Sequence, residues 1–177
     1  MALVISGDSP SFSGTYQGGV ITSGTAVAST SGTSITFSSI PSWVKRITVM
    51  FNGVSVSSTA LPIVQLGTSS GVVTSGYSGL GMYITSGPGL TTNSSGFIVN
   101  NVGTAAQAIS GSLILNLLNS SSNLWEANGT FVGTGTYNQI AISGGAITLS
   151  SLLTQLVITT IGGTNTFTAG SINILYE

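Results

Sequence analysis

Turn-forming pairs of residues punctuate this 177-residue sequence and leave only short segments between them. They recur from one end to the other, as in Ser31-Gly32, Asn52-Gly53, Asn128-Gly129 and Gly162-Gly163. Ser, Thr, Val and Ile dominate the segments between these pairs and favour strands, whereas the strong helix formers Glu, Lys and Arg are nearly missing. Short strands at this spacing are typical of antiparallel sandwiches. The sequence therefore predicts an all-β fold, an antiparallel β-sandwich of jelly-roll type.

Alternation of apolar and polar residues marks the expected strands. They span residues 33–37, 46–51, 62–66, 82–85, 97–99, 108–118, 124–132, 146–149, 155–161 and 171–176. The segments 108–118 and 124–132 are predicted to pair as a long hairpin across residues 119–123. Residues 150–154 fit either a short helix or a turn that enters the next strand.

The first 32 residues differ from the rest, because they are rich in Gly, Ser and Thr and carry no long apolar alternation. They fit two interpretations: a strand pair of the same sandwich, or an attachment segment that becomes ordered when it docks on a partner. We favour the second. The expected organisation is an N-terminal attachment segment over residues 1–32 and a β-sandwich domain over residues 33–177.

Ionisable side chains are so scarce that they exclude most catalytic and metal chemistry. The charged residues are Asp8, Lys45, Arg46, Glu126 and Glu177, and the sequence has neither His nor Cys. Disulfides, thiolate or imidazole metal sites and His-dependent nucleophiles are therefore excluded. Two cations cannot form a basic surface for nucleic acid. We expect a non-enzymatic protein with no catalytic residue, no cofactor, no metal site and no nucleic-acid partner.

An enzyme alternative needs a pair of carboxylates. Glycoside hydrolysis uses two carboxyl groups that flank the scissile bond. In this sequence Glu126 would have to be paired with Asp8 or Glu177, across subunits if necessary.

The mean hydropathy of +0.53 raises the question of a membrane protein. Apolar runs are nevertheless short, and none approaches the roughly 20 residues of a spanning helix, so no membrane span is expected. The first residues also lack the basic region of a signal peptide.

A surface with so few charges has little protection against association. The formal net charge is −1, whereas soluble monomers usually keep their net charge away from zero. We therefore expect the chain to form a homo-oligomer that buries sheet edges and apolar patches. Because few groups titrate, its stability should be nearly constant from mild acid to mild base.

Aromatic residues are the candidates for contact with a ligand. Aromatic rings on a neutral sandwich stack on sugars, and Tyr77, Tyr83, Tyr137 and Trp125 could serve in this way. The alternative is that these residues belong to loops and to the core. Of these four residues, we predict that Tyr77, Tyr83 and Trp125 contact a ligand.

The two cations are adjacent, at Lys45 and Arg46, and follow a turn at Pro41. Trp43 is expected to pack back against the end of the sandwich. The cations either stay solvated or meet a carboxylate such as that of Glu177, or else they contact an anionic ligand or another subunit.

Three segments together resemble a module of tailed-bacteriophage proteins. They read TSITFSSIPSWVKRITVMFNGVS (33–55), PIVQLGTSSGVVTSGY (62–77) and TFTAGSINILYE (166–177). The chain is similar, over roughly residues 33–177, to the β-sandwich domains of tail-fibre and related virion surface proteins.

The resemblance implies a place on the outside of a virion, assembled in the host cytoplasm. It implies a capsid decoration or head fibre, or a tail-fibre component, that forms a homotrimer and contacts capsid or tail proteins. It carries over no catalytic residue. The alternative function is a carbohydrate-binding, receptor-recognition module that contacts a glycan of the host surface.

Overall fold

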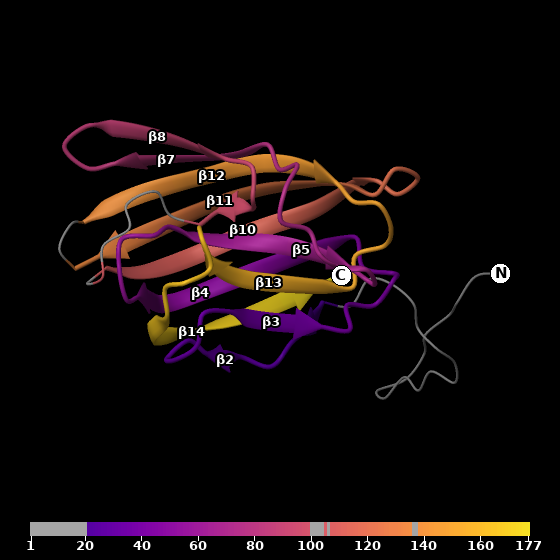
Figure 1. Ribbon diagram of the computed structural model, residues 1–177, viewed down its shortest axis with the longest axis horizontal. Helices are drawn as coiled ribbons and strands as arrows, with labels where there is room; N and C mark the ends of the chain where they lie inside the picture. The colour runs from indigo at the N-terminus through magenta and orange to yellow at the C-terminus, as the bar shows by residue number, and fades with distance from the viewer. Residues whose placement is uncertain (1–20, 100–104, 106, 136–137) are drawn as a thin grey trace, which may run out of the picture.

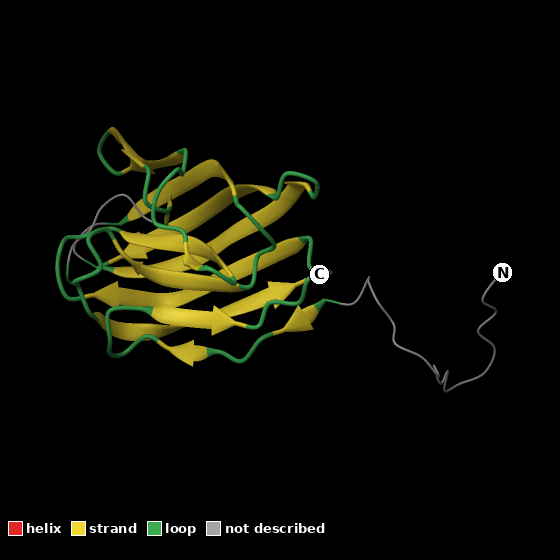
Figure 2. Cartoon of the chain, turned by 45° about the vertical axis from the view of Figure 1, so that its right-hand side comes forward, coloured by secondary structure: helices red, strands yellow, loops and turns green. Residues whose placement is uncertain are grey.

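The computed structural model describes residues 21–99, 105, 107–135 and 138–177, and across these residues it has fourteen strands and no helix. Two antiparallel sheets pack face to face, which confirms the predicted antiparallel β-sandwich (Figures 1 and 2). None of the described residues forms a helix long and apolar enough to cross a membrane.

The large sheet has nine strands. Its main path runs, in spatial order, through β1 (Thr22–Ser23), β14 (Phe167–Tyr176), β4 (Arg46–Val56), β10 (Ala108–Asn119), β11 (Leu124–Thr134), β12 (Gln139–Thr148), β7 (Gly79–Ile84) and β8 (Pro88–Asn93). The short β2 (Val27–Ala28) also pairs with β14. Figure 1 shows the hairpin of β7 and β8 at one edge of this sheet.

The small sheet has five strands. Its path runs through β3 (Ile35–Ser38), β13 (Gln155–Thr160), β5 (Pro62–Thr68) and β6 (Gly71–Val72), and β9 (Phe97–Ile98) pairs with β5. The chain passes repeatedly between the two sheets, so residues far apart in sequence face each other across the core.

The predicted long hairpin is confirmed, because β10 and β11 pair in antiparallel register around the turn at residues 119–123. Several turn signals nevertheless lie inside strands. Asn52-Gly53 does not end β4, because Gly53 adopts a φ of 62° at an irregularity of the pairing and the strand runs on to Val56. Gly144-Gly145 lies within β12, where the backbone of residues 78–79 leaves no room for a side chain on Gly145.

Residues 88–93 form β8, which the sequence did not predict because it starts with Pro88-Gly89. The strand lies at the edge of the sheet, and proline is tolerated as the first residue of an edge strand.

The sandwich begins earlier than the boundary predicted at residue 33. Both β1 and β2 lie within the segment 1–32 and pair with β14. Ser29 is fully buried and donates hydrogen bonds from its backbone N–H to Gly170 O and from its hydroxyl to Ala169 O. The sheet therefore includes the chain from Thr22 onward. Residues 1–20 of the proposed attachment segment lie outside the described residues.

The core fills the space between the two sheets. The inner face of β4 contributes Ile47, Val49 and Phe51, and the Phe51 ring meets the Phe131 ring edge-on at 5.7 Å. Trp43 packs against one end of this core, with its ring 5.8 Å from that of Tyr176.

Candidate functional site

The aromatic residues predicted to contact a ligand are mostly core residues. Trp125 is 3% exposed on the inner face of β11, and Tyr77 is 4% exposed, with its ring edge-on to Phe97 at 5.0 Å. Neither ring has a free face on which a sugar could stack. Both residues therefore fit the alternative that they belong to the core. Tyr83 is partly buried and packs against the core from the inner face of β7, with its ring over Gly89. Tyr137 lies outside the described residues.

The hydroxyl of Tyr77 links β5 to the residue that follows β6 by hydrogen bonds. It accepts a hydrogen bond from the Leu66 N–H at 2.7 Å and donates one to Val73 O at 3.0 Å. Burial raises the pKa of Tyr77 to about 12, although the hydrogen bond from Leu66 acts in the opposite direction. The phenol is therefore a structural group, neutral at physiological pH.

A groove of about 460 Å³ borders Tyr77 and is also lined by Leu80, Thr92 and Asn93. The Asn93 side chain is already engaged, because its Nδ2 donates to Gly96 O at 2.8 Å and its Oδ1 accepts from Ser95 Oγ at 3.0 Å. The hydroxyl groups of Ser78, Thr92 and Ser94 also line this groove.

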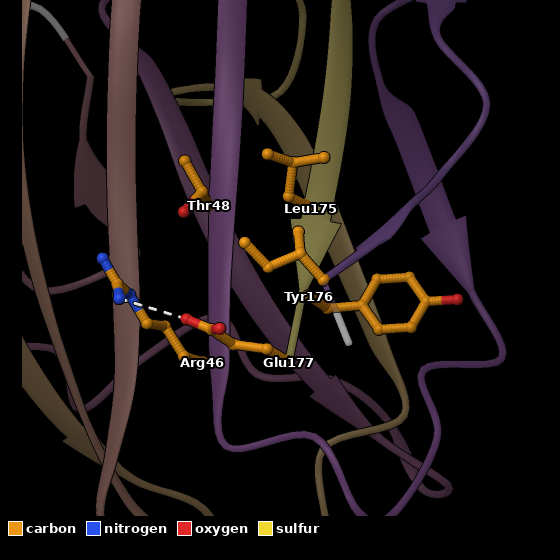
Figure 3. A pocket seen from close by; sticks show the side chains of 6 residues that line it. Arg46, Thr48, Leu175, Tyr176 and Glu177 are labelled. Atoms are coloured by element: carbon orange, nitrogen blue, oxygen red, sulfur yellow. Dashed lines mark hydrogen bonds and ion pairs between the residues drawn. The ribbon is translucent and has the colours of Figure 1, made fainter. Parts of the chain in front are cut away.

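Arg46 and Glu177 form an ion pair beside a small pocket of about 100 Å³ (Figure 3). Arg46 Nη1 lies 3.1 Å from Glu177 Oε1, and the two side chains are 47% and 37% exposed. The backbone N–H groups of Lys45 and Arg46 both donate to the backbone oxygen of Glu177. The interpretation that a carboxylate meets these cations is therefore confirmed for Arg46.

We expect Arg46→Gln to change the free energy of unfolding by less than about 0.5 kcal/mol, because exposed ion pairs are weak. Urea denaturation at low and high salt would measure this. A larger loss that persists in high salt, where exposed pairs are screened, would contradict it.

Glu126 lies in the same row across the outer face of the large sheet. Arg46 is opposite Asn116 on β10, and Asn116 is opposite Glu126 on β11. The Glu126 carboxylate accepts hydrogen bonds from Nδ2 of Asn116 at 2.5 Å and from Nδ2 of Asn128 at 3.1 Å. Two amides therefore hold this carboxylate in place.

Glu126 and Glu177 are not brought together as a pair. Their strands, β11 and β14, are three positions apart in the sheet, which separates the two backbones by about 14 Å at the usual strand spacing. Carboxyl pairs in glycosidases are roughly 5–9.5 Å apart. Asp8, the other partner considered for Glu126, lies outside the described residues.

The most distinctive surface is a cluster of large aliphatic side chains on the outer face of the large sheet, near its β8 edge. We call it the apolar outer face, and it comprises Leu80, Ile84, Leu90, Val132, Ile140 and Ile142. These side chains are 45–69% exposed. Ile84, Ile140 and Val132 lie directly opposite one another on β7, β12 and β11. The cluster is therefore continuous across strands and contains no charged residue.

Small residues on the inner side explain why these aliphatic residues point outward. Ile140 and Ile142 alternate with Ala141 and Ser143, which face the core. Strand β9 occupies that space: Ser143 Oγ donates to the backbone oxygen of Ile98, and Gly81 lies against the Ile98 side chain. Larger residues would collide with β9, so the inner positions are small and the large ones lie outside.

Sequence reasoning anticipated apolar patches but did not locate this one. The sequence does show Ile140 and Ile142 alternating with smaller residues. Such an alternation defines two faces of a strand, but it does not say which of them is buried. No protein-family model, curated protein or solved structure matches this chain.

Proposed function

We propose that the chain is a non-enzymatic structural subunit of a bacteriophage virion surface, and that it self-associates through the apolar outer face. The observation that carries the self-association is the exposure of six aliphatic side chains on one uncharged face. Contiguous apolar patches of this kind mark interaction sites. The resemblance of residues 33–55, 62–77 and 166–177 to virion surface modules supplies the setting. This resemblance is compatible with a capsid decoration or head fibre and with a tail-fibre component.

A second copy of this chain is the occupant that fits the apolar outer face. The face has no charge to pair, so its partner must be uncharged, and the chain itself supplies such a face. Among the described residues β8 is the edge strand of the large sheet, and edge strands are where a sheet can pair with another copy. The resemblance favours three copies.

The free energy gained by burying the apolar outer face is similar in size to the free energy that association costs. Burying a whole Leu, Ile or Val side chain contributes about 1.5–3 kcal/mol, so covering six that are roughly half exposed contributes about 5–9 kcal/mol. Association costs about 4–15 kcal/mol in lost freedom of motion. Because the two terms are similar, disrupting the face should abolish assembly.

Light scattering on purified protein tests the assembly. We expect a mass of about 53 kDa, three times the 17.7 kDa of one chain. Ile140→Lys places a charge in the middle of the apolar outer face and should leave a folded monomer. Leu152→Lys is the matched control, because Leu152 is 51% exposed but lies in the connection between β12 and β13, and it should remain trimeric. A monomeric wild-type chain, or a trimeric Ile140→Lys variant, would contradict the proposal.

The virion setting has a separate test. Mass spectrometry of purified particles of the phage that encodes the chain should detect it as a component. Its absence from the particles, together with no affinity of the purified protein for capsids or tails, would refute the setting and leave the assembly result standing.

A further inference from the structure

The outer face of the small sheet is hollowed into a trough of about 470 Å³, within the roughly 300–1,000 Å³ of small-molecule sites. Its floor consists of Ile63 and Gln65 from β5 and Val157 and Thr159 from β13. Residues 33–34, 72, 74, 95 and 162–163 form its walls. The floor residues are only 1–8% exposed although they point away from the core, because these walls rise around them.

Hydrogen bonds tie the floor of the trough to its walls. Gln65 Nε2 donates to Ser95 O at 2.8 Å, and Thr159 Oγ1 donates to Thr33 O at 2.8 Å. The trough is therefore already shaped without a ligand, which reduces the ordering that binding would require.

The chemistry of the lining selects an uncharged, hydroxyl-bearing ligand. No charged side chain lines the trough. The hydroxyls of Thr33, Ser34 and Thr74 are exposed and make no hydrogen bond within the described part of the chain. Aliphatic groups on the floor complement the C–H faces of a sugar ring, while the wall hydroxyls complement its edges.

We propose that this trough binds a neutral saccharide. An extended peptide fits it less well, because β5 and β13 already pair with a strand on each side and cannot accept another. The proposal goes beyond the assembly role and does not rest on it, because the trough and the apolar outer face lie on different sheets. It also places carbohydrate binding on hydroxyl groups and away from the buried rings of Tyr77 and Trp125.

The test is an NMR titration of the full chain with neutral oligosaccharides of glucose, galactose, mannose and N-acetylglucosamine. We expect at least one to give saturable shifts confined to the residues that line the trough, in β5 and β13 and at positions 33–34, 72, 74 and 162–163. The affinity should be the same at low and high salt, because no charge lines the trough. The double variant Ser34→Ala/Thr74→Val should weaken binding about fivefold or more, since it removes two neutral hydrogen bonds. Thr130→Val, an exposed threonine on the other sheet, is the matched control and should bind like the wild type.

Several outcomes would overturn the proposal. They are the lack of saturable shifts with every oligosaccharide, shifts located at the groove beside Tyr77, and binding that survives the double variant unchanged. Saturation of the trough by an uncharged extended peptide in place of a saccharide would also overturn it. The monomeric Ile140→Lys variant should bind saccharide normally, so a failure of assembly is distinguishable from a failure of this site.

Discussion

Gly170→Ala should destabilise the fold by about 3–5 kcal/mol, one of the largest losses available from a single methyl group. Gly170 has a φ of +91° at an irregularity in the pairing of β14 with β4. A Cβ there would lie 2.5 Å from Gly53 O and 2.6 Å from Asn52 O. Because both atoms belong to the backbone of β4, they cannot move aside as a flexible side chain would. Chemical denaturation at a fixed protein concentration measures the loss.

Gly76→Ala is the control for the conformational part of this effect. Gly76 has a similar φ of +86°, but a Cβ there would meet nothing within 4 Å. Only the strain of the left-handed conformation remains, which amounts to about 1–2 kcal/mol. Equal losses in the two variants would show that close packing at Gly170 contributes nothing.

Tyr77→Phe should cost about 2–4 kcal/mol although it removes one oxygen atom. The buried Leu66 N–H loses its hydrogen bond to the phenol, which costs about 1–3 kcal/mol, and the part-buried Val73 O loses a second hydrogen bond, worth about 1 kcal/mol. The ring and its contact with Phe97 remain, so the loss isolates the hydroxyl. An unchanged free energy of unfolding would refute the structural role of this group.

Tyr77 also predicts how stability depends on pH at the alkaline end. Its pKa is raised from 10.0 to about 12 in the folded protein, so the folded state keeps its proton longer than the unfolded state. The resulting stabilisation is present below pH 10 and is lost as the pH rises to about 12. Two pKa units correspond to about 2–3 kcal/mol. Thermal melts should be nearly constant from mild acid to mild base and fall above this range, with a smaller fall in Tyr77→Phe.

The strands with strong alternation were predictable from local sequence. The hairpin of β10 and β11 needed only two long alternating segments and a polar turn between them. Strand β8 was not predictable, because Pro88-Gly89 is a turn signal and only its position at the sheet edge makes it compatible with a strand. The pairing of β1 and β2 with β14 joins residues about 150 positions apart in the sequence, a long-range contact that no local pattern reports.

The candidate surfaces were less predictable than the fold. Tyr77 follows a glycine-rich turn and reads as an exposed loop residue, yet its ring and hydroxyl fill the gap where β6 ends. The trough gathers residues 33–34, 63, 65, 72, 74, 157, 159 and 162–163, which come together only when β3, β13, β5 and β6 form one sheet.

Local sequence was enough to establish an all-β molecule with almost no charge, because turn residues at short intervals exclude long helices and a total of five charged side chains excludes most catalytic chemistry. It also determined two faces for each strand, since side chains alternate with a period of two. Which of the two faces is buried depends on how the strands pack in the fold. At Ile140 and Ile142 hydrophobicity alone would place the large side chains inside, but β9 crosses that part of the core and fills it. The small residues therefore face inward and the aliphatic ones outward, which creates the apolar outer face.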